Sequence, residues 1–225
     1  MVGGQSLDFD LLGLYLGVFM MRDRTTGSVW AQMDGLASQG PFAGERLPFV
    51  PMPQMTWGQW KSDYPSTLVL DNNTGFQSQY GDRFLNQTDP SLASFGDNRL
   101  PSNELVVGVE VNGQFAGFPV AEITKAGGVV NTEIGGVPVV VLYDADNQTG
   151  IAYKRTVDGQ TLTFTNQYPT GFVISDDQSG SLWTSRGTGL IGDFKDAALE
   201  FVPSFISEWY GWSAYHPQTS LYAGT

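Results

Sequence analysis

The chain contains no cysteine and only one histidine, His216. Without cysteine it forms no disulfide, offers no thiolate to a metal and has no Cys nucleophile. A single histidine also excludes the common catalytic triads and His-based zinc sites. The remaining ligands are oxygen atoms, which suit calcium or magnesium rather than zinc or copper. We therefore expect no cofactor and no bound transition metal.

Basic residues are scarce, because 11 Lys and Arg stand against 23 Asp and Glu, for a net charge of −12. A surface of this sign repels phosphates and anionic lipids, so we expect no nucleic-acid partner. Apolar runs of membrane-spanning length are also lacking. The run Leu11–Met21 follows Asp8 and Asp10 and is too short to cross a bilayer. We interpret it as a buried strand, with no signal peptide and no membrane insertion.

Glycine and aromatic residues, in contrast, are plentiful. The chain has 28 Gly, 12 Pro and 13% aromatic residues, a composition that argues against disorder and against a helical bundle. Asn112-Gly113 and Asp158-Gly159 are turn dipeptides between alternating apolar runs, which predicts two hairpins. Val137–Tyr143 is typical of a strand that is buried on both faces. The sequence therefore predicts a mainly β, α+β fold of antiparallel hairpins.

The chain also repeats itself. Residues 40–70 match residues 192–222 without a gap, and ten of the 31 pairs are identical, two of them tryptophan pairs. The match extends upstream with small changes of offset, so that Val2 faces Val157. We infer two sequence-related units, each closed by a short helix.

Residues 104–156 have no counterpart in the first copy. This pattern predicts a truncated first repeat unit at 1–70, an ordered connector at 71–103 and a complete second unit at 104–225, all in one compact body. Strands of the truncated unit would have lost sheet neighbours, and an uncovered edge or apolar face promotes association. We therefore expect either a core shared within one chain or self-association through the first unit.

The two predicted helices each carry a pair of tryptophans at helical spacing. Thr56 and Ser207 are candidate N-caps, and a proline follows each helix. The tryptophans are Trp57, Trp60, Trp209 and Trp212. Such pairs line sugar-binding platforms in some proteins, but more often they clamp a helix to a sheet. We assign them a structural role and expect all four to be buried.

Carboxylates are the remaining candidates for chemistry. Asp144 and Asp146 resemble the start of a calcium loop, although glycine is missing from its sixth position. Asp176 and Asp177 stand in a predicted turn, and Glu133 has no evident partner. We take these five as weak candidates for ligand or cation contact and assign no catalytic or metal-binding residue. His216, at the end of a predicted helix, is interpreted as a packing or capping residue.

Several motifs together resemble a known family. They are TTGSVW (25–30) with its counterpart QSGSLW (178–183), VVGVEVNGQFAGFPV (106–120) and VNTEIGGVPVVV (130–141). Nearly the whole chain is similar to the family catalogued as domain of unknown function 3179, whose members often carry export signals. The resemblance implies no particular activity. Many members have a Cys-Pro-x-Cys element and a His-Glu pair, but the aligned residues here are Asp144 and Asn147, and Gly127 and Gly128. No functional residue is therefore carried over.

Three functions remain open. The leading hypothesis is a non-enzymatic binding or structural module that works outside the cytoplasm, with an unknown ligand. The first alternative is a carboxylate-dependent hydrolase or lyase that acts in the cleft between the units. The second is a structural subunit that self-assembles through strand pairing. A pocket in which two carboxylates converge would favour the enzyme.

Overall fold

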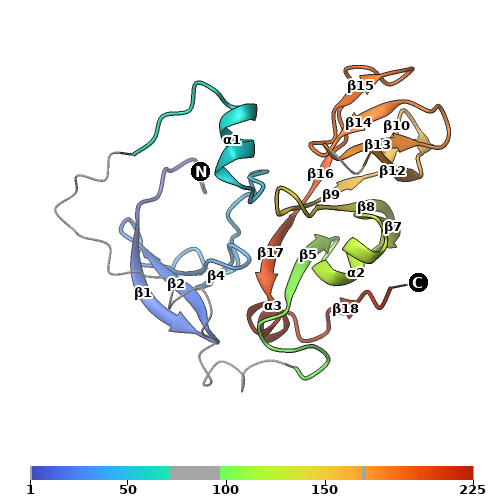
Figure 1. The fold of residues 1–225 in the computed structure, drawn as a ribbon. Coiled ribbons are helices and arrows are strands. Elements are labelled where there is room, and N and C mark those ends of the chain that lie inside the picture. Colours follow the sequence, from blue (N-terminus) through green and yellow to red (C-terminus); the bar gives the residue numbers. More distant parts are fainter. Residues whose placement is uncertain (1, 71–96, 169–170, 225) are drawn as a thin grey trace.

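The computed structural model describes residues 2–70, 97–168 and 171–224. Within them the chain is mainly β, with antiparallel sheets and three short helices, as the sequence predicted. Figure 1 shows the first half, residues 2–70, beside the second half, residues 97–224. None of the helices in the described part is long and apolar enough to cross a membrane.

The first half consists of one four-stranded sheet in the order β1-β2-β3-β4, followed by a helix. Its elements are β1 (Phe9–Tyr15), β2 (Val18–Asp23), β3 (Val29–Ala31), β4 (Ala37–Gln39) and α1 (Trp57–Asp63). The helix begins after Thr56, whose hydroxyl accepts a hydrogen bond from the Gln59 backbone N–H at 3.3 Å, so this predicted N-cap is confirmed.

The second half contains three four-stranded sheets, a two-stranded ribbon and two helices. Two of the sheets have the orders β17-β5-β6-β18 and β16-β9-β8-β7, and the third has the order β12-β13-β14-β15. The bounds are β5 (Leu105–Val111), β6 (Gln114–Pro119), α2 (Val120–Lys125), β7 (Val129–Ile134), β8 (Val137–Asp144), β9 (Thr149–Lys154), β10 (Thr156–Val157), β11 (Gln160–Thr161), β12 (Phe164–Tyr168), β13 (Val173–Asp176), β14 (Leu182–Thr184), β15 (Gly189–Ile191), β16 (Phe201–Val202), β17 (Ser204–Glu208), α3 (Trp209–Tyr215) and β18 (Ser220–Leu221).

Strand β8 lies between two apolar cores. Val139 and Val141 face a core shared with β5 and β6, whereas Val140 and Leu142 face a core shared with the β12–β15 sheet. Because side chains alternate along a strand, a continuous apolar run is needed to fill both cores. The prediction that this strand is buried on both faces is confirmed.

The predicted turns are present where the dipeptides stand. Asn112 and Gly113 have φ angles of 51° and 73°, and Asp158 and Gly159 have φ angles of 50° and 80°. Two consecutive positive φ values define the turn that matches the twist of a two-residue hairpin. These turns join β5 to β6 and β10 to β11.

The β1–β4 and β12–β15 sheets have the same strand order and share several hydrogen bonds around a buried aspartate. Asp23, buried in the first, accepts a 2.9 Å bond from the Trp30 indole, and Asp176 accepts one of the same length from Trp183. The segments that follow helices α1 and α3 are held in the same way. The indole of Trp60 donates a hydrogen bond to the Thr67 hydroxyl, and that of Trp212 donates to the Thr219 hydroxyl, each at 2.9 Å. The division into units at 1–70, 71–103 and 104–225 stays a prediction, and most of the connector (71–96) lies outside the described residues.

Two expectations for the first half are wrong. Leu11–Met21 is an exposed hairpin and not a single buried strand, because Leu16 and Gly17 turn the chain with positive φ and join β1 to β2. Of the four tryptophans, Trp209 and Trp212 are buried, but Trp60 is only partly buried and Trp57 is largely exposed. The same sequence pattern therefore has different burial in the two halves.

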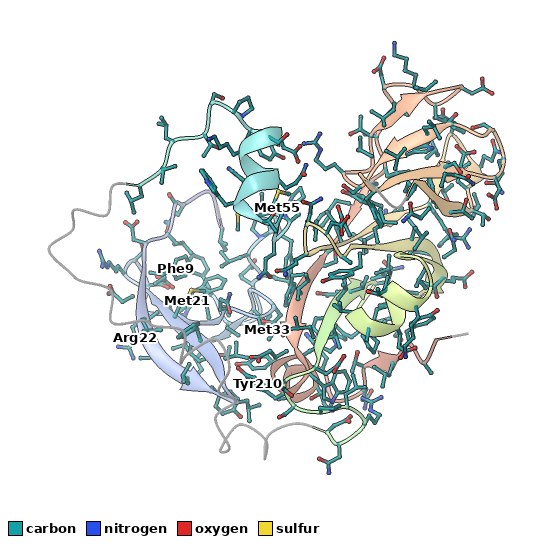
Figure 2. The ribbon with its side chains drawn as sticks, viewed as in Figure 1. Phe9, Met21, Arg22, Met33, Met55 and Tyr210 are labelled. Atoms are coloured by element: carbon teal, nitrogen blue, oxygen red, sulfur yellow. The ribbon has the colours of Figure 1, made fainter. Side chains whose placement is uncertain are left out.

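The two halves are joined by a modest apolar contact. Val18 and Met33 from the first half pack with Val106, Trp209 and Trp212 of the second. Figure 2 shows Met33 at this boundary near Tyr210, whereas Phe9 and Met21 lie within the first sheet. Polar contacts add to it, since Arg46 pairs with Glu110 at 2.7 Å and Arg186 with Asp63 at 3.0 Å.

Candidate functional site

One exposed apolar surface is a face of the β1–β2 hairpin. Leu11 lies opposite Met21, and Leu14 lies opposite Phe19, so these cross-strand pairs share a face. A bulge between Leu11 and Gly13 keeps both pairs on that side. We call this surface the hairpin face, made of Phe9, Leu11, Leu14, Phe19 and Met21. Leu11, Leu14 and Phe19 are largely exposed, and Phe9 and Met21 are half-buried.

A second exposed apolar surface surrounds helix α1. Trp57 and Trp60 line a hollow of about 610 Å³ together with Pro53 and the segment 68–70. Leu68, Val69 and Leu70 are all largely exposed. Three consecutive apolar side chains in extended backbone are typical of a strand that pairs in a sheet, yet the structure gives them no strand partner among the described residues.

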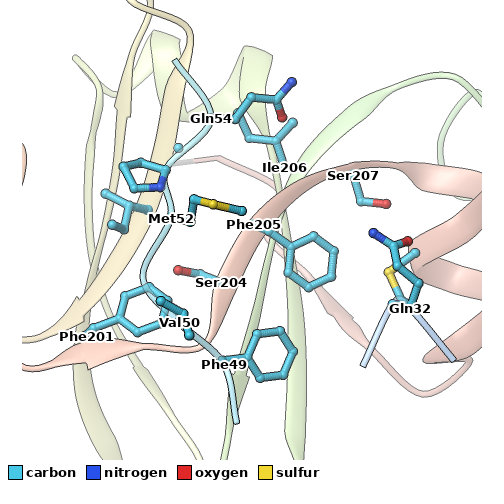
Figure 3. Close-up of a pocket in the computed structure, with 14 residues that line it drawn as sticks. Gln32, Phe49, Val50, Met52, Gln54, Phe201, Ser204, Phe205, Ile206 and Ser207 are labelled. Carbon is cyan, nitrogen blue, oxygen red and sulfur yellow. The ribbon is translucent and has the colours of Figure 1, made fainter. Parts of the chain in front are cut away.

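A groove of about 540 Å³ runs between the halves, as Figure 3 shows. Phe49, Val50 and Met52 form one wall, and Phe205 and Ile206 of β17 form part of the other. The lining side chains are apolar or neutral polar, such as those of Gln32, Gln54 and Ser207, and the Ser204 hydroxyl accepts a bond from the Ala152 N–H. This groove suits an apolar polypeptide segment rather than proton transfer.

The predicted Asp144 site is a turn at the edge of a separate pocket. One oxygen of Asp144 accepts from the backbone N–H groups of Asp146 and Asn147, at 3.1 and 3.2 Å, and the other accepts from the Asn147 amide at 2.8 Å. These bonds fix the loop between β8 and β9. Asp144, Asp146 and Asn166 line a pocket of about 330 Å³. Burial, together with the nearby Asp144 charge, raises the pKa of Tyr143 in the same pocket.

The other predicted carboxylates are not brought to this pocket. Asp176 is buried in the β13–β14 turn, where it accepts bonds from the Ser179 N–H and the Trp183 indole. Asp177 and Glu133 are exposed, and Glu133 lies on β7 opposite Pro138. Of the five candidates, the structure places only Asp144 and Asp146 in one pocket.

His216 is buried at the C-terminal end of α3. Its ring stacks on Phe115 with the centroids 3.9 Å apart, and it also contacts Trp212 at 4.4 Å. Burial lowers the pKa of His216 to about 4, against a smaller opposing effect of the Asp34 charge. A neutral, stacked imidazole fits the packing role that the sequence predicted.

Asp23 is a buried carboxylate whose pKa is nevertheless lowered. Burial raises its pKa, but the hydrogen bonds from Trp30, Thr26 and Ser28 outweigh this and bring the pKa down to about 2. The side chain is therefore ionised at neutral pH and holds the β2–β3 turn. Among the residues that the structure describes, no group of three or more His, Asp or Glu is placed to hold a metal ion.

A comparison with models of protein families matches residues 1–219 to the family described as Protein of unknown function (DUF3179). The chain belongs to this family. Neither the search of curated proteins nor the search of solved structures found a match.

The DUF3179 resemblance pointed to a thiolate or His-Glu site at Gly127, Gly128, Asp144 and Asn147, and three of these positions line the Asp144 pocket. They do not fit such a site in this chain, because glycine carries no ligand. A Cβ on Gly128 would lie 2.5 Å from the Phe172 ring, and its φ of +86° already disfavours a side chain. The carboxylates of the pocket are those of Asp144 and Asp146, beside the Asn166 amide and the hydroxyl-bearing Thr124 and Tyr143.

The hairpin face was missed as a set of residues. Its apolar run was visible, but an apolar run indicates a strand and not what covers the strand. The lack of a counterpart for residues 104–156 in the first copy did predict an uncovered edge or apolar face in the first unit, but not which residues form it. In the second half those residues form β5–β9, which supply most of the covering side chains.

Proposed function

We propose that this DUF3179 chain is a non-enzymatic polypeptide-binding or structural module that binds through the hairpin face of its first half. The observation that carries the proposal is the exposure of Leu11, Leu14 and Phe19 together on one side of a two-stranded hairpin. Covering one such side chain is worth roughly 1.5–3 kcal/mol. Contiguous exposed apolar side chains of this kind mark interaction surfaces on soluble proteins.

The edge strand β1 adds a backbone contribution. The sheet order β1-β2-β3-β4 leaves β1 paired on one side only. A partner strand laid along that edge gains main-chain hydrogen bonds, and its side chains on the same side extend the hairpin face and pack beside those of β1. The salt bridge between Arg24 and Asp10, on the outer part of the hairpin, keeps the strand end in register without covering its apolar side chains.

The proposal includes a location outside the cytoplasm, which rests on the family resemblance alone. Cell fractionation tests it, because detection of the chain only in the cytoplasmic fraction would contradict that location.

The enzyme alternative assigned a carboxylate-dependent hydrolase or lyase to the cleft between the units. The groove of Figure 3 is lined by neutral side chains, but a smaller pocket between the halves, of about 270 Å³, is lined by Glu110 and Glu200. Both carboxylates are paired, Glu110 with Arg46 at 2.7 Å and Glu200 with Lys154 at 2.6 Å, which favours a structural role for them. The alternative can also use the pocket of Asp144 and Asp146. There Asp144 already accepts three hydrogen bonds that hold its own turn. These bonds favour a structural role for Asp144.

Site-specific photocrosslinking in the source cells tests the proposed function. A benzophenone amino acid replaces Leu14 in one variant and Ile191 of β15 in the other, a matched control because the two side chains are 64% and 63% exposed. We expect Leu14, and not Ile191, to give an adduct with one discrete polypeptide that mass spectrometry identifies. An adduct with a second copy of this chain would favour the self-assembly alternative. Equal labelling at both positions would refute a binding surface on the hairpin.

A further inference from the structure

We propose that the partner of the first half is a polypeptide segment with the strand order and side-chain pattern of β5–β9. This inference rests on the proposed function and names its ligand class. The first half presents three exposed pieces, the hairpin face, helix α1 and the extended segments at 52–56 and 68–70. Each has a counterpart in the second half, and each counterpart packs on β5–β9.

The hairpin face is the first piece. Phe172 in the second half corresponds to Phe19 in the first, because each lies four residues ahead of the buried aspartate that ends the strand. Phe172 is 5% exposed, whereas Phe19 is 51% exposed. The difference comes from β7–β9, because Phe172 shares a core with Val140, Leu142 and Ile151. The β12 edge is covered too, since the Asn131 side chain on β7 bonds both the N–H and the C=O of Phe164.

Helix α1 is the second piece. Trp57 and its counterpart Trp209 are 56% and 0% exposed, although their helices have the same length and the same type of C-cap. Trp209 lies over Gly117 of β6, and Trp212 lies against Gly108 of β5. Among the described residues, no glycine-bearing strand lies beneath Trp57 and Trp60 in this way.

The extended segments are the third piece. In the second half, β17 pairs with β5 from Ser204 to Glu208, and β18 pairs in parallel with β6. The matching residues 52–56 and 68–70 of the first half form no strand. Leu68 and Leu70 project almost fully into solvent. Both segments therefore lack the sheet that their counterparts complete, although the Thr56 N–H bonds the Asn147 carbonyl of the second half at 3.0 Å.

The three pieces point to one occupant, because β5–β9 pack on the counterparts of all three. A second copy of this chain in its described conformation does not supply them, since its own β5–β9 are already covered by β12–β18 and α3. The partner is thus a segment of the same type that lies outside the described residues. It needs glycine at the place of Gly108, because a Cβ there would overlap the ring of the packed tryptophan. It also needs glycine at the place of Gly128, which makes room for the phenylalanine.

The test adds such a segment to the full chain. Val157 corresponds to Val2, so a copy of residues 104–155 joined directly ahead of Met1 stands at the spacing found in the second half. This copy contains no tryptophan, so all six tryptophans of the fusion are those of the chain itself. Acrylamide quenching then reports mainly on Trp57, the most exposed of the six.

We expect the added copy to remove most of the acrylamide-quenchable fluorescence. Hydrogen exchange of the β1 and β2 amides should slow by about tenfold or more, because opening those strands would now break a packed core. The matched control is the same fusion with Gly108→Val in the added copy only. The valine side chain would occupy the space that the Trp60 ring needs. It should leave both signals close to those of the unmodified chain.

Three results would overturn the inference. They are unchanged quenching and exchange in the fusion, equal protection in the Gly108→Val control, or protection that appears only with concentration-dependent association in light scattering. If the fusion fails while Leu14 still crosslinks to a discrete polypeptide, the partner class is wrong and the proposed function stands. If both fail, the hairpin face is not a binding surface.

Discussion

Replacing Trp209 and Trp57 by alanine, one at a time, compares two residues that share a sequence motif and differ in what lies beneath them. Trp209 is fully buried, its indole donates to the Asp97 carbonyl at 2.9 Å, and the Arg99 guanidinium lies 5.2 Å from its ring. Trp57 occupies the same place in the first half but is largely exposed.

The expected losses of stability follow from the buried area. A tryptophan that buries about 200 Å² contributes up to about 5 kcal/mol at 25 cal/mol per Å², and Trp→Ala in a core costs about 3–5 kcal/mol. We expect Trp209→Ala to lose a free energy of unfolding in that range. Trp57 buries less than half of its surface, so Trp57→Ala should cost no more than about 2 kcal/mol.

Urea unfolding followed by far-UV circular dichroism measures both variants without relying on the tryptophan signal. The midpoint and the slope are compared with those of the unmodified chain, because a changed slope would show that more than stability had changed. Equal losses for the two variants would refute the argument that β5–β6 decide the burial of these residues. A larger loss for Trp57→Ala would refute it as well.

Three further predictions concern single side chains. His216 has a pKa of about 4 in the folded chain, below its ordinary 6.5. Its contribution to the free energy of unfolding is therefore complete above pH 6.5. As the pH drops to 4, this contribution falls by about 2 kcal/mol after allowance for solvent screening. His216→Tyr, which copies Tyr64 of the first half, should remove that part of the pH dependence in thermal unfolding. Asp23 has a folded pKa of about 2, below its ordinary 3.8, so its contribution is present above pH 3.8 and is lost towards pH 2. Asp23→Asn should flatten this acid limb, and an unchanged limb would contradict the assignment. Gly108→Ala should destabilise by about 3 kcal/mol in chemical denaturation because its Cβ meets the Trp212 ring, whereas Gly58→Ala, in open space on helix α1, should stabilise by about 0.5–1 kcal/mol.

Local structure was largely predictable from the sequence. The hairpins at Asn112-Gly113 and Asp158-Gly159 form as expected, because few residue pairs tolerate two positive φ angles in succession. The N-cap of α1 at Thr56 was also correct. Helix α2 was missed, since Val120–Lys125 is a single short helix that continues directly from β6 and has no side-chain cap. For α3 the predicted cap was Ser207, but β17 extends to Glu208 and that residue is the N-cap.

The candidate site was predicted less well. Asp144 and Asp146 do share a pocket, but Asp176 holds a turn, and Asp177 and Glu133 point to solvent. A short motif such as Asp-x-Asp shows which carboxylate oxygens are present, but not whether they already accept hydrogen bonds from backbone N–H groups. Asp144 and Asp176 are both taken in this way.

The sequence by itself determined the hairpins at Asn112-Gly113 and Asp158-Gly159, the strand at 137–143 and the likeness between residues 40–70 and 192–222. Only the tertiary structure decided which copies of the shared residues are buried. Trp57 and Trp209 begin matching helices and differ in burial because β5 and β6 lie beneath Trp209 alone, and Phe172 is buried where Phe19 is not because it packs on β8 and β9. Turn formation depends on neighbouring residues along the chain, whereas burial depends on a second surface brought from elsewhere, and a local pattern contains no record of that surface.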